Sequence, residues 1–275
     1  MQNILRGAWL GAALLPGTLV APDTSPLAVW VVWTLWASVA IGVLVPHPLS
    51  LTVIRFFAPL VTLHAAWMVA TDDGTRWSAI GGVVALIAVS IVAFLPAYGE
   101  VHAQAAAYGH ERRHLLRPPV AVVLPVALLW SLVAVAATFA VYSESLVVAG
   151  IASAAGASVG TFALRRALVL ARRWLVFVPA GIAVHDPLVL RDTFMVRSHD
   201  VRGLRIAAAD TEAFDTTCVT WGEALELQLA HPHDVSLSQF GARIGRTLDR
   251  LHVTALLVAP SRPSRALANQ RPAAS

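Results

Sequence analysis

Charged side chains are scarce in this chain, and lysine is absent altogether: the 20 residues counted as Lys and Arg are all arginine. Charged residues make up 13% of the 275 residues, whereas soluble domains carry roughly 25%. With 57% hydrophobic residues and a mean hydropathy of +0.68, one water-soluble core cannot hide all the apolar surface. These deficits exclude an ordinary soluble domain and predict an α-helical polytopic membrane protein.

Other absences narrow the chemistry. Cys218 is the single cysteine, so an intramolecular disulfide is excluded and an oxidising compartment is not implied. The chain has no phosphate-binding or dinucleotide-binding glycine motif and no paired cysteines, and it lacks the aromatic-basic platforms of nucleic-acid-binding proteins. We therefore expect no enzyme activity, no cofactor and no nucleic-acid partner. Arginine in place of lysine, with abundant Ala, Val, Leu, Gly and Pro, is typical of high-GC bacterial genomes and indicates an actinobacterial source.

Six apolar stretches are long enough, or nearly so, to cross about 30 Å of hydrocarbon. They cover residues 4–20, 27–45, 51–70, 78–96, 120–141 and 146–164. The first is the shortest and contains Pro16. We assign residues 1–170 to a bundle of about six transmembrane helices.

The arginines beside these stretches predict the orientation. In a six-span arrangement one side of the bundle carries only Arg76, and the other carries Arg6, Arg55, Arg112, Arg113, Arg117, Arg165, Arg166, Arg172 and Arg173. Arginine-rich loops face the cytoplasm in membrane proteins. The sequence therefore predicts a multi-pass protein of the bacterial inner (plasma) membrane with both termini in the cytoplasm.

Beyond residue 170 the hydrophobic pattern shortens to that of strands. Strand candidates cover residues 174–178, 182–184, 189–196, 204–207 and 224–229, and in the last of these Glu226 is expected to face water. Apolar residues then recur at helical spacing over 235–251, with a capping box that begins at Ser236, and residues 254–258 form one more strand candidate. We expect a small cytoplasmic α+β domain over residues 171–259, with strands first and an amphipathic helix after them, and a disordered tail over 260–275.

Two short runs carry a resemblance. Residues 173–182, Arg-Trp-Leu-Val-Phe-Val-Pro-Ala-Gly-Ile, and residues 200–204, Asp-Val-Arg-Gly-Leu, resemble bacterial pleckstrin-homology-like (PH-like) domains appended to membrane spans. The resemblance covers residues 173–252, and the whole layout is similar to actinobacterial polytopic membrane proteins. It implies a module that binds a protein partner or lipid headgroups. The favoured function is a non-enzymatic inner-membrane scaffold or accessory protein.

Residues 110–114 read His-Glu-Arg-Arg-His, which matches the H-E-x-x-H pattern of zinc metalloproteases. On a helix, His110 and His114 would share one face as zinc ligands and Glu111 would act as the general base. The two intervening arginines would repel a dication, no third ligand follows at a matching spacing, and a proline pair ends any helix early. We interpret the stretch as a basic loop between two spans and keep a membrane zinc metalloprotease as the alternative.

The densest basic cluster lies where the last span meets the domain. It comprises Arg165, Arg166, Arg172 and Arg173, and Arg117 is expected to join it. Near an anionic leaflet each arginine contributes about 1 kcal/mol of attraction. We predict that this cluster binds anionic headgroups and holds the domain against the bilayer.

Two ionisable residues lie inside the third span. Arg55 is near its cytoplasmic end, where it can reach the phosphates. His64 lies deeper and is interpreted as a neutral, hydrogen-bonded histidine, with a polar pathway as the alternative. The span region has no chain of acids for a proton relay, so a small-solute or lipid transporter is the weaker hypothesis.

Small residues recur in the sixth stretch, at Gly150, Ala154, Gly156, Ser158 and Gly160. Such spacing lets helix backbones approach closely. It predicts packing within the bundle, and a homo-oligomer seam is the alternative.

Overall fold

A computed structural model describes residues 2–20, 24–71, 76–218 and 221–270. Its contacts divide the chain into two units. A helical unit comprises Met1–His102 and Ala127–Arg166, and a β unit comprises Ala103–Val126 and Ala167–Ser275. A single boundary at residue 170 does not describe this division, because Ala103–Val126 belongs to the β unit although it precedes that boundary.

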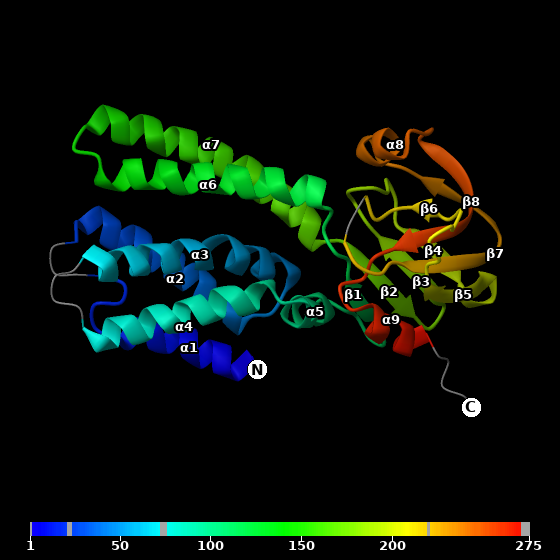
Figure 1. The fold of residues 1–275 in the computed structure, drawn as a ribbon, viewed down its shortest axis with the longest axis horizontal. Coiled ribbons are helices and arrows are strands. Elements are labelled where there is room, and N and C mark those ends of the chain that lie inside the picture. Colours follow the sequence, from blue (N-terminus) through cyan, green and yellow to red (C-terminus); the bar gives the residue numbers. More distant parts are fainter. Residues whose placement is uncertain (1, 21–23, 72–75, 219–220, 271–275) are drawn as a thin grey trace. The chain divides into compact units, whose positions relative to one another are not determined.

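The helices follow the apolar stretches closely (Figure 1). They are α1 (Gln2–Leu14), α2 (Pro26–Leu44), α3 (Pro48–Thr71), α4 (Trp77–Phe94), the short α5 (Pro96–Ala105), α6 (Val120–Tyr142) and α7 (Leu146–Ala171). Five of these described helices, α2, α3, α4, α6 and α7, are long and apolar enough to cross a membrane. The prediction of a helical membrane part is confirmed to this extent.

The first expected span differs from the other five because α1 has only 13 residues. Pro16 lacks a backbone N–H and clashes with the carbonyl four residues earlier, so it ends the helix. The backbone then forms tight turns, in which Leu15 N donates to Ala12 O at 3.3 Å and Thr18 N donates to Leu15 O at 3.2 Å. Gly17 permits this turn because its φ of 79° lies in the left-handed region.

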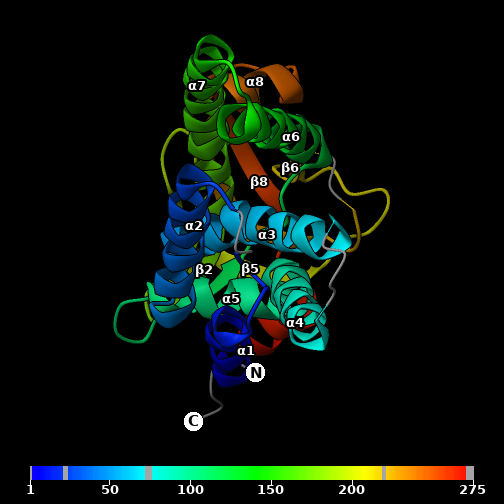
Figure 2. The same cartoon turned by 90° about the vertical axis from the view of Figure 1, so that its left-hand side faces the viewer.

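Helices α1 to α4 pack as a bundle (Figure 2), in which α1 packs against both α2 and α4. Near one end of α1, Arg6 donates from Nε to Val43 O at 3.2 Å and from Nη2 to Leu44 O at 3.1 Å. Near the other end, the Ser78 hydroxyl at the start of α4 donates to Pro16 O at 3.2 Å. Residues 6–16 therefore reach from the last turn of α2 to the first turn of α4.

The β unit contains two four-stranded sheets. The first has the order β1 (Arg112–Leu115), β2 (Trp174–Val178), β3 (Gly181–His185) and β4 (Phe194–Arg197), all antiparallel. The second has the order β5 (Val201–Ile206), β7 (Leu225–Ser236), β8 (Arg250–Val258) and β6 (Phe214–Asp215), with β6 parallel to β8. Leu175, Val184, Val196, Leu227 and Leu256 belong to one buried apolar core. The expected α+β domain is confirmed in this coarse sense.

The details of the C-terminal part depart from expectation. The helical spacing predicted over 235–251 is divided between the end of β7, α8 (Gln239–Gly245) and the start of β8, and the N-cap of α8 is Ser238, whose hydroxyl accepts from Gly241 N at 2.9 Å. The expected disordered tail contains α9 (Pro263–Gln270), and residues 271–275 lie outside the described residues. Glu226 is buried instead of facing water. It forms a salt bridge with Arg205 and accepts a hydrogen bond from the Gln228 side chain.

A buried ion pair ties the first sheet to the segments around it. Arg173 Nε and Nη2 donate to Asp186 Oδ1 and Oδ2, both at 2.7 Å, and each residue is 1% exposed. Arg173 Nη1 also donates to Arg117 O at 2.8 Å, and Asp186 Oδ1 accepts from Leu188 N at 3.1 Å. The pair thus connects the start of β2, the turn after β3 and the linker that follows β1.

We expect Asp186→Ala to destabilise the β unit by about 3–5 kcal/mol, because it leaves the Arg173 guanidinium buried without its counter-ion. The matched control is His252→Ala, which removes an exposed side-chain contact with Asp234 and should change stability by less than about 1 kcal/mol. Thermal unfolding of the purified full chain, followed by circular dichroism, measures both. Equal effects of the two substitutions would contradict the role assigned to the pair.

Candidate functional site

The outer face of the first sheet presents a continuous row of side chains. Strand register places Arg113 opposite Val176, Val176 opposite Ala183, and Ala183 opposite Met195. Side chains alternate between the two faces of a strand. Neighbouring residues such as Leu175 and Val184 therefore point into the core, and this row points away from it. The row therefore lies across all four strands on the face opposite the core.

Trp174 stands next to this row at the start of β2. Arg113 Cζ lies 4.8 Å from the centroid of the indole ring, and the His185 ring stacks on it with centroids 5.3 Å apart and planes 29° from parallel. The indole Nε1 donates to Ala171 O at 3.1 Å, which fixes the orientation of the ring. A cation–π contact and a ring stack thus hold one partly exposed aromatic side chain in place.

The turn before β1 fixes Arg113. Its Nε and Nη2 donate to Glu111 Oε2 at 3.0 and 2.7 Å, and its backbone N donates to Gln104 Oε1 at 2.9 Å. The hydrogen bond from Arg113 lowers the pKa of Glu111, so the carboxylate stays ionised at neutral pH. The positive charge of Arg113 is therefore already balanced within the site.

Together these residues form a groove of about 550 Å³, which we call the sheet groove. Val176 and Ala183 form its apolar floor. Trp174 and Met195 add further apolar surface, and Met195 is 52% exposed. On the same face, His185 Nδ1 is hydrogen-bonded to Thr193 Oγ1 at 2.8 Å. Such a surface can accept apolar or aromatic side chains, with hydrogen-bonding groups beside them.

The His-Glu-Arg-Arg-His stretch is neither the basic loop nor the zinc-binding helix that the sequence suggests. Residues Arg112–Leu115 form β1 instead of a loop or a helix. His110 is exposed in the preceding turn, whereas His114 is 3% exposed, with Nε2 bonded to Asn269 Nδ2 at 2.9 Å. Among the residues that the structure describes, no three His, Cys, Asp or Glu side chains are placed to hold one metal ion. The helical geometry on which the zinc hypothesis depends is therefore missing here.

The arginines of the predicted headgroup cluster differ in their exposure to solvent. Arg165, Arg166 and Arg172 are exposed, and Arg166 Cζ lies 5.1 Å from the Phe162 ring centroid. The prediction is wrong for Arg173, because its guanidinium is buried against Asp186. Arg117 is partly exposed and donates to the carbonyls of Trp221 and Glu223 within the β unit.

The two ionisable residues of α3 both have partners inside the helical unit. Arg55 Nε donates to Ala93 O at 2.9 Å, near the C-terminal end of α4, and its guanidinium lies 5.6 Å from the Phe94 ring centroid. Cations near a helix C-terminus are stabilised by the helix dipole. His64 Nε2 is bonded to Leu19 O at 3.1 Å, so the expectation of a hydrogen-bonded histidine is confirmed.

One further pattern lies in α7, where residues 156–160 read Gly-Ala-Ser-Val-Gly. In hydrolases a G-x-S-x-G motif exposes its serine on a sharp strand-to-helix turn. Here Ser158 lies inside a continuous helix and its hydroxyl donates to Ala154 O at 2.8 Å. Gly156 instead approaches Ala136 of α6, as helix packing through small residues requires.

Comparisons of the chain with family models, with curated proteins and with solved structures found no match.

The sheet groove predicts a pH dependence. Burial, together with Arg113 and Arg172, lowers the pKa of His185 below its ordinary value of 6.5, and Asp186 opposes the shift. The unfolded chain therefore takes up this proton first, so the stability is full above about pH 6.5 and falls below it. We expect His185→Phe to remove this component, measured as the wild-type minus variant difference in unfolding free energy from pH 7.5 to pH 5. A difference that favours the wild type more strongly at low pH would contradict the shift.

Proposed function

We propose that this chain is a non-enzymatic, multi-pass protein of the bacterial inner membrane. It holds a PH-like α+β domain at the cytoplasmic face and presents the sheet groove to a protein partner, as a scaffold or accessory subunit does. The observation that carries the proposal is the groove itself, an exposed apolar surface with a fixed tryptophan at its edge. Exposed apolar patches bordered by polar groups are typical of protein interaction sites.

A six-span topology is part of the proposal. Although α1 is short, the N-terminal segment reaches from the end of α2 to the start of α4, which a crossing requires. Strand β1 precedes α6 and strand β2 follows α7, and the two strands pair residue by residue. This pairing supports one side of the membrane for both ends of the α6–α7 pair. Arginine-rich loops on that side favour the cytoplasm.

A protein partner fits the groove better than an anionic headgroup does. Phosphate recognition needs converging free cations, but Arg113 is engaged by Glu111 and the floor is apolar. The exposed Arg165, Arg166 and Arg172 are better suited to headgroups, where they would hold the domain near the bilayer. The PH-like assignment draws support from the two four-stranded sheets and the terminal helix α9.

Met195→Glu should abolish partner binding through the groove, because it places a charge on an apolar contact surface. Ile206→Glu on β5 is the matched control, since Ile206 is also 52% exposed but lies on the other sheet. Affinity purification of each full-length variant from its native membranes, followed by mass spectrometry, compares the co-purifying proteins. An identical set for the wild type and Met195→Glu would refute the proposal.

A further inference from the structure

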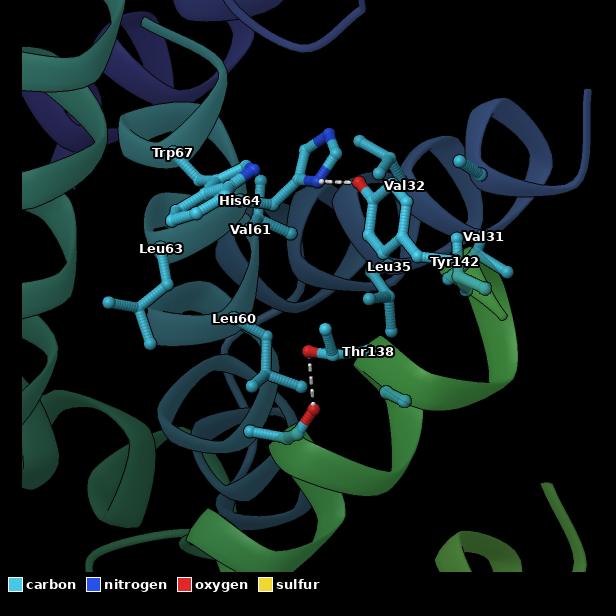
Figure 3. A pocket seen from close by; sticks show the side chains of 14 residues that line it. Val31, Val32, Leu35, Leu60, Val61, Leu63, His64, Trp67, Thr138 and Tyr142 are labelled. Carbon is cyan, nitrogen blue, oxygen red and sulfur yellow. Dashed lines mark hydrogen bonds between the residues drawn. The ribbon is translucent and has the colours of Figure 1, made fainter. Parts of the chain in front are cut away.

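Within the helical unit, α2, α3 and α6 line a cavity of about 620 Å³ (Figure 3). Pockets of this size hold small molecules in many proteins. Its walls are apolar along most of their length, as Val32, Leu35, Leu60 and Val141 illustrate. Because these helices are long and apolar enough to cross a membrane, we expect molecules of the hydrocarbon phase to reach the cavity.

Two polar side chains meet at one place in this apolar lining. The Tyr142 hydroxyl lies 3.4 Å from His64 Nδ1, and both side chains line the cavity (Figure 3). The opposite ring nitrogen, Nε2, faces the carbonyl oxygen of Leu19, which can only accept a hydrogen bond. Nε2 therefore carries a proton, and in a neutral ring Nδ1 is then the acceptor and the tyrosine hydroxyl its donor.

The other groups of the lining offer no charge to a ligand. Among the described residues that line the cavity, none is an aspartate, glutamate or arginine, and the Thr138 hydroxyl already donates to Ala134 O at 3.0 Å. A carboxylate or phosphate in such surroundings would lack a counter-ion, at a high desolvation cost. The lining therefore selects for a neutral molecule.

We propose that this cavity binds a neutral lipid-like molecule that carries a free hydroxyl group. A hydroxyl both donates and accepts, so it can replace the direct contact between Tyr142 and His64 once the two side chains move apart, donating to Nδ1 and accepting from the tyrosine. The apolar chain then lies along α2, α3 and α6. The site is separate from the sheet groove and does not depend on it.

Photolabelling of the full-length protein in proteoliposomes tests this proposal. The probe is a long-chain alcohol that bears a diazirine near the chain end, compared with its methyl ether and with the carboxylic acid of equal length. We expect the alcohol to label α2, α3 or α6 saturably and the other two probes to label them several-fold less. Equal labelling by all three probes would mean that bulk lipid chains fill the cavity, and stronger labelling by the acid would mean that charge is accepted. Either result overturns the proposal.

Three variants locate the site. Tyr142→Phe removes one hydroxyl and should weaken labelling by the alcohol about fivefold, the loss expected for one neutral hydrogen bond. Ala137→Phe fills the cavity and should abolish saturable labelling, whereas Ala157→Phe, an exposed alanine of α7 outside the lining, should leave it unchanged. If Tyr142→Phe leaves labelling by the alcohol unchanged, the proposal is refuted even if Ala137→Phe fails to fold.

Discussion

The buried ion pair between Arg173 and Asp186 is the interaction on which the β unit depends. Two charges removed from water are costly unless every donor and acceptor is used, and here the guanidinium and the carboxylate meet in a bidentate contact with backbone groups as further partners. The pair and these partners belong to three segments: the linker after β1, the residue before β2, and the turn after β3. The pair therefore fixes how the first sheet is assembled, and with it the positions of Trp174 and His185 on the outer face.

The sheet groove follows from this assembly by simple alternation. Once the inward faces of β2, β3 and β4 are set by core residues, the outward residues must form a row, and β1 adds Arg113 to its edge. The arginine that the sequence places in a zinc-binding pattern thus serves to support an indole ring. A basic stretch that resembles a catalytic motif in sequence is the edge strand beside the sheet groove.

The sequence was sufficient where structure depends on local hydrophobic pattern. The five long helices and strands β2 and β3 lie close to where apolar runs and turn signals predict them. It was insufficient where partners are distant: β1 pairs with a strand about 60 residues later, which no local period reveals. Likewise, the sequence does not distinguish Arg173 from the neighbouring arginines, because its partner Asp186 is brought to it only by folding. The sheet groove and the His64–Tyr142 contact were missed because their members come from separate elements, although His64 itself was recognised as a polar residue inside a span.

The order of the strands has a consequence for how the protein is made. Synthesis proceeds from the N-terminus, so β1 leaves the ribosome before α6 and α7, and its partner β2 follows only after both helices. Until then β1 is an unpaired edge with no sheet to join. The first sheet can close only after α6 and α7 have both been made, because β2 follows them and is the partner of β1. Completion of the β unit is thereby coupled to the correct placement of α6 and α7.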